Sequence, residues 1–177
     1  IFIDCLNTGM KKTMYFLLAA AMLGCNASET SSPAKEEAIK KEYAKGSFGY
    51  DLDFLQKHDS VIVLSNGSSQ VIVSAKYQAK VFTSTADGLD GNSFGWIHYS
   101  AFDGPLDPHM NGYGGENRFW LGPEGGKFSL YFPKDAKMEF ANWKTPAPID
   151  HEPWELKDKN EGKVTLEKKM QILNYAG

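Results

Sequence analysis

The chain contains Val61-Ile62-Val63-Leu64-Ser65-Asn66-Gly67-Ser68-Ser69-Gln70-Val71-Ile72-Val73-Ser74, two runs of mostly β-branched residues joined by a polar loop. β-branched side chains favour strands, and Asn-Gly is a strong signal for a tight turn between antiparallel strands. Residues 61–74 are therefore predicted to form a β-hairpin.

From Gly46 onward the sequence predicts a series of short secondary-structure elements. Gly49–His58 has a short helix-like spacing, and three prolines make Trp143–Trp154 a crossing loop. No long 3.6-residue period is present, and short strands about 8 to 12 residues apart indicate an all-β, antiparallel sandwich or barrel. Further strands are predicted at Tyr77–Ser84, Phe94–Phe102, Arg118–Leu121, Phe128–Phe132 and Lys163–Leu173.

The first 24 residues are interpreted as material ahead of the mature protein. Residues 1–9 precede the first methionine and are taken as an upstream, non-native segment. Residues 10–24 have the order of a lipoprotein signal peptide, with basic Met10-Lys11-Lys12, apolar Thr13–Leu23 and the small residue Gly24. A spanning helix needs about 20 apolar residues, so this segment is expected to be cleaved.

Met22-Leu23-Gly24-Cys25 is similar to the lipobox of bacterial lipoproteins, in which the cysteine is acylated. Acyl chains contribute about 0.8 kcal/mol per buried methylene, so a multiply acylated Cys25 would hold the protein on a membrane. An unmodified cysteine is the alternative. Residues 25–45 are polar and predict a flexible tether before a folded domain at 46–177. We therefore expect an exported, membrane-anchored lipoprotein in the periplasm or on the surface of a Gram-negative bacterium.

Composition excludes several classes of function. The net charge is −3, with 19 basic and 22 acidic residues and no basic cluster, so no nucleic-acid partner is expected. The cysteines are Cys5 and Cys25, so the mature chain has no disulfide, thiol nucleophile or cysteine-based zinc site. The sequence has no nucleotide-binding loop, dinucleotide fingerprint or hydrolase elbow, and no metal or cofactor is expected.

The segment from Gly114 to Gly126 gathers two carboxylates, an arginine, aromatic residues and five glycines. Alternation along a strand would point Arg118, Trp120 and, after the turn, Glu124 toward one face. Such a face suits a planar or hydroxyl-rich ligand. The alternative is a structural corner in which Arg118 and Glu124 form a buried ion pair.

Histidines and aromatic residues supply further candidates. His98 and His109 are candidate general acids or bases, paired with a carboxylate such as Glu116 or Glu124. The alternative for each histidine is a packed, hydrogen-bonded residue. Trp96 could join Trp120 as a sugar-stacking surface, although large aromatic residues are commonly core.

The segment Gly114-Gly115-Glu116-Asn117-Arg118-Phe119-Trp120-Leu121-Gly122-Pro123-Glu124 resembles the Gly-Gly-x-Arg-x-Trp-x-x-Pro-Glu stretch of galactose mutarotase-like (aldose 1-epimerase-like) proteins, with one additional residue before the arginine. Three other segments resemble an uncharacterised group of exported bacterial lipoproteins with that fold: Tyr77–Ala86, Phe94–Ile97 and Asn142–Pro146. The resemblance covers residues 49–177.

The resemblance implies a large antiparallel β-supersandwich of which this chain is the N-terminal half. The strand predicted at 163–173 has no later segment to pair with, which also predicts a chain incomplete at its C-terminus. Arg118 then corresponds to the substrate-side arginine of a hexose cleft. The family's catalytic glutamate comes from the later part, so Glu124 does not replace it and the fragment alone is expected to be inactive.

Three functions stay open at this point. The first is aldose epimerisation or a related sugar transformation. The second is noncatalytic glycan capture on Trp96, Trp120 and Arg118. The third is a structural surface module whose glycine-rich segment only closes the fold. The expected partners are a carbohydrate and, through Cys25, a membrane.

Overall fold

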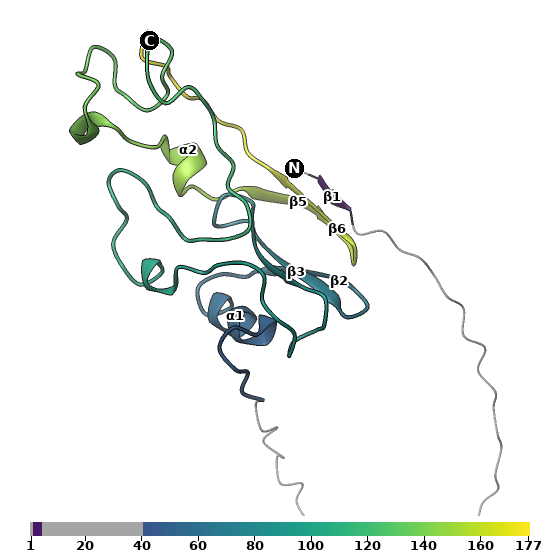
Figure 1. Ribbon diagram of the computed structural model, residues 1–177. Helices are drawn as coiled ribbons and strands as arrows, with labels where there is room; N and C mark the ends of the chain where they lie inside the picture. The colour runs from purple at the N-terminus through teal and green to yellow at the C-terminus, as the bar shows by residue number, and fades with distance from the viewer. Residues whose placement is uncertain (1, 5–40) are drawn as a thin grey trace, which may run out of the picture. The chain divides into compact units, whose positions relative to one another are not determined.

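A computed structural model describes residues 2–4 and 41–177 of the protein (Figure 1). The strands are β1 (Phe2–Asp4), β2 (Ile62–Asn66), β3 (Ser69–Ser74), β4 (Lys80–Thr85), β5 (Glu155–Lys159) and β6 (Lys163–Glu167). The helices are α1 (Phe48–Leu55), the single turn α2 (Ala147–Asp150) and two 3₁₀ turns, Tyr99–Ala101 and Phe140–Asn142. The strands form two three-stranded antiparallel sheets, β2-β3-β4 and β1-β6-β5. The predicted all-β class is confirmed.

The predicted hairpin is the centre of the first sheet. Ile62 pairs with Val73 and Leu64 with Val71, and the turn residue Gly67 has a φ of +63°. Glycine adopts this left-handed conformation without the steric cost that a Cβ would add. β4 joins the free side of β3, with a bulge between Ile72 and Val73.

Helix α1 covers this sheet through the first core cluster. Ser47 caps the helix by accepting a hydrogen bond from the Tyr50 amide at 3.3 Å. Phe48 and Leu55 are fully buried and pack in one cluster with Ile72 of β3 and other apolar residues. The short helix expected at 49–58 is therefore confirmed.

The second sheet packs on the first through a second core cluster. Val164 and Leu166 of β6 are buried together with Leu64 and Val73 of the hairpin. β6 has β5 on one side and β1 on the other, where Phe2 pairs with Thr165. β1 comes from residues 1–9, which are interpreted from the sequence as an upstream segment, and the structure pairs it with the domain.

The strand predicted at 163–173 is shorter, because β6 ends at Glu167. Its partner β5 begins at Glu155, opposite Glu167, directly after Pro153 and Trp154. The next residue, Lys168, has no strand partner among the described residues and donates a hydrogen bond from its ammonium group to the Glu152 carboxylate at 2.6 Å.

The strands predicted at 94–102, 118–121 and 128–132 are wrong. In the first segment Ile97 makes one isolated bridge to Gly114, and a 3₁₀ turn follows. In the other two, side chains replace the strand ladder: Tyr131 donates its hydroxyl to the Leu121 carbonyl at 2.6 Å. The Trp143–Trp154 crossing is irregular as predicted, except for α2, which holds a proline in its first turn.

The predicted signal peptide at 10–24, Cys25 and tether residues 25–40 lie outside the described residues. Residues 41–45 contain no helix or strand. Among the helices of the described part, none is long and apolar enough to cross a membrane.

Candidate functional site

The first residues of the glycine-rich segment are hydrogen-bonded to β4. Gly114 has a φ of +82°, and a Cβ there would lie 2.2 Å from the Trp96 carbonyl oxygen. Glu116 then accepts hydrogen bonds from the Ser84 amide at 2.7 Å and the Ser84 hydroxyl at 2.8 Å. Asn117 accepts one from the Val81 amide at 2.8 Å. One oxygen of the predicted ligand-binding residue Glu116 is thus occupied in holding this segment on the sheet.

Arg118 is held by a carboxylate that the sequence did not single out. Its guanidinium donates to Asp150 at 2.8 Å and to the Asn111 carbonyl at 3.0 Å. The Asp150 side chain is 3% exposed and also accepts from the Asn111 amide at 2.9 Å. The Arg118–Glu124 ion pair of the structural-corner alternative is therefore wrong, because Asp150 takes the place assigned to Glu124. Asp150 lies 32 positions further along the chain, so no local pattern marks it.

A second cation lies beside Arg118. Lys80 is 3% exposed and donates to the Asn117 carbonyl at 2.8 Å. Burial and, to a smaller extent, the charge of Arg118 lower the pKa of Lys80 to about 8. The negative charge of Asp150 thus neutralises Arg118, while the adjacent charge of Lys80 is not paired with Asp150.

Aromatic rings continue from Arg118 in a row that we call the aromatic row: Trp120, Tyr131, Trp143, Phe140 and His109. The Arg118 guanidinium lies 4.8 Å from the Trp120 ring centre. The Tyr131 and Trp143 rings are 5.4 Å apart and 9° from parallel. Phe140 and Trp143 are 6.3 Å apart and 12° from parallel. Four segments of the chain therefore contribute to one stacked row.

A cavity of about 340 Å³ opens beside this row, and we call it the glutamate cavity. The Trp120 indole donates to one Glu124 carboxylate oxygen at 2.9 Å, so the predicted trio Arg118, Trp120 and Glu124 is brought together. Glu139 and Phe140 were missed, since an isolated acidic–aromatic pair gives no signal in the sequence. The cavity is lined by Glu124, Phe132, Met138, Glu139, Phe140 and Trp143.

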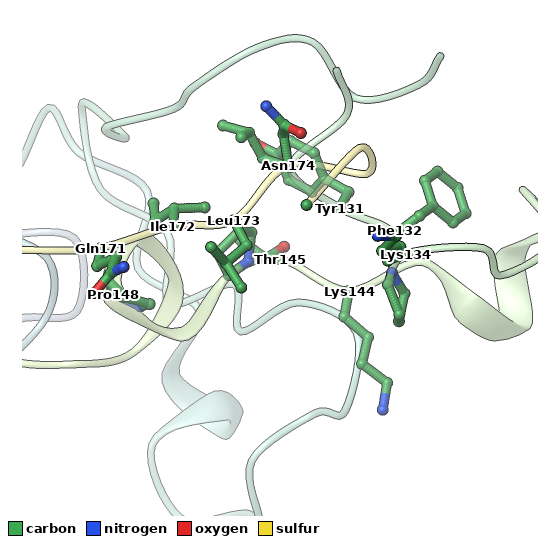
Figure 2. Close-up of a pocket in the computed structure, with 14 residues that line it drawn as sticks. Tyr131, Phe132, Lys134, Lys144, Thr145, Pro148, Gln171, Ile172, Leu173 and Asn174 are labelled. Carbon is green, nitrogen blue, oxygen red and sulfur yellow. The ribbon is translucent and has the colours of Figure 1, made fainter. Parts of the chain in front are cut away.

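A larger cavity of about 560 Å³ shares Phe132 with the glutamate cavity, and Figure 2 shows its lining. Its walls are mostly apolar, with Ile172 and Leu173 on one side. Lys134 and Lys144 also line it, and we call it the lysine cavity. The charged groups are thus divided, with carboxylates on one cavity and ammonium groups on the other.

The two candidate histidines lie in different surroundings. His98 donates from Nδ1 to the Gly112 carbonyl at 2.8 Å and stacks on Trp96, whose ring centre is 5.3 Å away. Trp96 is 66% exposed and does not belong to the aromatic row. His109 ends that row and donates from Nδ1 to the Trp143 carbonyl at 2.6 Å.

Among the described residues, the candidate histidines form neither an acid–base pair with a carboxylate nor a metal site. Across 41–177, neither His98 nor His109 forms a hydrogen bond to a carboxylate. The described residues also contain no group of three His, Cys, Asp or Glu side chains placed to hold a metal ion. The arrangement is suited to stacking and hydrogen bonding of a ligand.

The model of DUF6786, a family of unknown function, matches residues 46–177. The chain belongs to DUF6786. The match begins at Gly46, where the sequence predicts the folded domain to start. No curated protein and no solved structure matches the chain. The DUF6786 domain therefore contains the whole glycine-rich segment, the aromatic row and both cavities.

Proposed function

We propose that this DUF6786 protein binds carbohydrate in the glutamate cavity. The observation that carries the proposal is the placement of three aromatic rings and two carboxylates on one cavity of about 340 Å³. Small-molecule sites have volumes of about 300–1,000 Å³, so the cavity has room for a ligand of monosaccharide size.

The chemistry of the lining matches the two surfaces of a sugar. The apolar C–H face of a pyranose stacks on an aromatic ring, while its hydroxyls donate to carboxylates. Phe140 is 71% exposed and Trp143 is partly exposed beside it, so ring surface is accessible. Glu124 and Glu139 supply the acceptors.

Binding without turnover is better supported than epimerisation. The acid–base pair predicted from the sequence for epimerisation joins a histidine to a carboxylate on the same ligand. Neither candidate histidine lines the glutamate cavity. We also propose that the domain is the N-terminal half of a mutarotase-like sandwich, because the segment from Gly114 to Glu124 resembles the glycine-rich stretch of that family.

The proposal also places the domain outside the cytoplasm. A lipidated Cys25 would anchor it to a membrane, and the tether would carry the cavity toward glycans in the periplasm or at the cell surface. The order of signal peptide, lipobox cysteine and polar tether supports this placement.

The test is a glycan array followed by calorimetry with the full chain. Trp143→Ala should weaken binding at least about tenfold, which is 1.4 kcal/mol, because it removes a stacking surface of the cavity. Trp96→Ala is the matched control, since this exposed tryptophan lies outside the cavity. Trp143→Phe checks folding and should retain most of the affinity. Absence of binding to every glycan on the array would overturn the proposal.

A further inference from the structure

We infer that the ligand of the glutamate cavity carries an ammonium group, so that its substrate class is an amino sugar with a free amine. This inference rests on the proposed carbohydrate binding and specifies that the bound sugar is positively charged.

The charges around the cavity are the first argument. Glu124 and Glu139 line it, and its lining contains no lysine or arginine. Lys134 and Lys144 line the neighbouring cavity instead. A ligand carboxylate placed between two glutamates would be repelled, whereas an ammonium group would be attracted.

Free hydrogen-bonding capacity is the second argument. One oxygen of Glu124 accepts from the Trp120 indole. In the part of the chain that the structure describes, the Glu139 carboxylate forms no hydrogen bond or ion pair. Glu139 can therefore accept from a ligand without breaking an existing contact.

The ring faces are the third argument. Phe140 and Trp143 lie 12° from parallel, and Phe140 is 71% exposed. The electron-rich face of an aromatic ring attracts cations. The aromatic row already holds one cation in this way, because the Arg118 guanidinium lies over Trp120 at its other end. Carboxylates combined with ring faces select an ammonium group over a neutral amide.

The experiment compares two ligands that differ in the amine alone. The full chain is titrated with an oligomer of glucosamine and with the N-acetylated oligomer of equal length, at mildly acidic pH and low salt. Since exposed cation–π contacts and ion pairs each contribute modestly, we expect the free amine to bind roughly five- to tenfold more tightly. Equal affinities would overturn the inference and leave the proposed function standing. Failure of both oligomers and of neutral glycans to bind would overturn both.

Charge-neutral variants locate the effect. Glu139→Gln should reduce the preference for the amine at least threefold while binding of the acetylated oligomer is kept. Glu161→Gln is the matched control, because Glu161 is exposed between β5 and β6 and does not line the cavity. The substitution therefore removes the same charge from outside the cavity. An equal loss in both variants would mean that net charge alone produces the preference, and the inference would be overturned.

Tetramethylammonium separates a sugar site from a site for any organic cation. It should displace the glucosamine oligomer from the cavity, with an affinity at least tenfold lower than that of the oligomer, because it lacks hydroxyls and a pyranose face. If it bound as tightly as the oligomer, the assignment to amino sugars would be wrong.

Discussion

Asp150 is the residue on which the position of Arg118 depends. It accepts hydrogen bonds from Arg118 at 2.8 Å and from the Asn111 side chain at 2.5 Å, while 3% exposed. Removal of one partner from a buried ion pair typically costs about 3–5 kcal/mol, so we expect Asp150→Asn to lower the free energy of unfolding by about 3 kcal/mol. Urea unfolding measures this change. Asp158→Asn, on an exposed position of β5, should change it by less than about 0.5 kcal/mol.

Lys80 predicts a distinctive dependence of stability on pH. Its pKa in the folded protein is about 8, whereas an unfolded lysine has a pKa of about 10.4. Between these values the unfolded chain binds more protons, so the contribution of Lys80 to stability rises as the pH increases. Below pH 8 the buried charge is a cost to the folded state.

Lys80→Met should therefore be more stable than the wild type at pH 7, by about 1–2 kcal/mol. The wild type should recover this difference between pH 8 and pH 9.5, by at most about 1.4 kcal/mol per pH unit. Urea unfolding of both proteins at pH 7, 8.5 and 9.5 provides the comparison. A difference that stays constant over this range would show that Lys80 does not titrate there.

At the scale of elements, the turn at Gly114 connects the glycine-rich segment to the first sheet. Gly114→Ala would place a Cβ 2.2 Å from the Trp96 carbonyl oxygen at a φ of +82°. We expect it to destabilise the fold by at least about 3 kcal/mol, since both the clash and the left-handed backbone oppose it. Gly112→Ala is the control, because a Cβ there meets no heavy atom within 4 Å. Thermal unfolding of both variants tests the contrast, and equal losses would contradict it.

Elements built from neighbouring residues were predictable from the sequence. The β2–β3 hairpin follows from Asn66-Gly67 between two β-branched runs, and α1 follows from spacing within ten residues. Residues 118–121 alternate in character as a strand does. However, Arg118 donates a hydrogen bond to Asp150, and the Trp120 ring packs on Tyr131 in the aromatic row. Those partners are distant in sequence, so periodicity does not reveal them.

The candidate site was predictable to a similar extent. Arg118, Trp120 and Glu124 are close in sequence, and the structure brings them together. Glu139 and Phe140 reach the same site from a different segment, through the stacking of Trp143 on Tyr131 and Trp120. Glu116 has the residue type of a ligand-binding group but bonds Ser84 of β4. Residue chemistry identified the region, and tertiary contacts determined its members.

At the scale of the whole molecule, the proposed location of the protein depends on Cys25, outside the described residues. If Cys25 is acylated, Cys25→Ser should move the protein from the membrane fraction to the soluble fraction of a bacterium that processes lipoproteins. The loss follows because each buried acyl methylene contributes about 0.8 kcal/mol to anchoring. Metabolic labelling with a fatty acid measures acylation directly, and the wild type should be labelled while the variant is not. Cys5→Ser is the matched control, because Cys5 precedes the predicted signal peptide. A Cys25→Ser variant that stayed on membranes would show that another part of the protein anchors it.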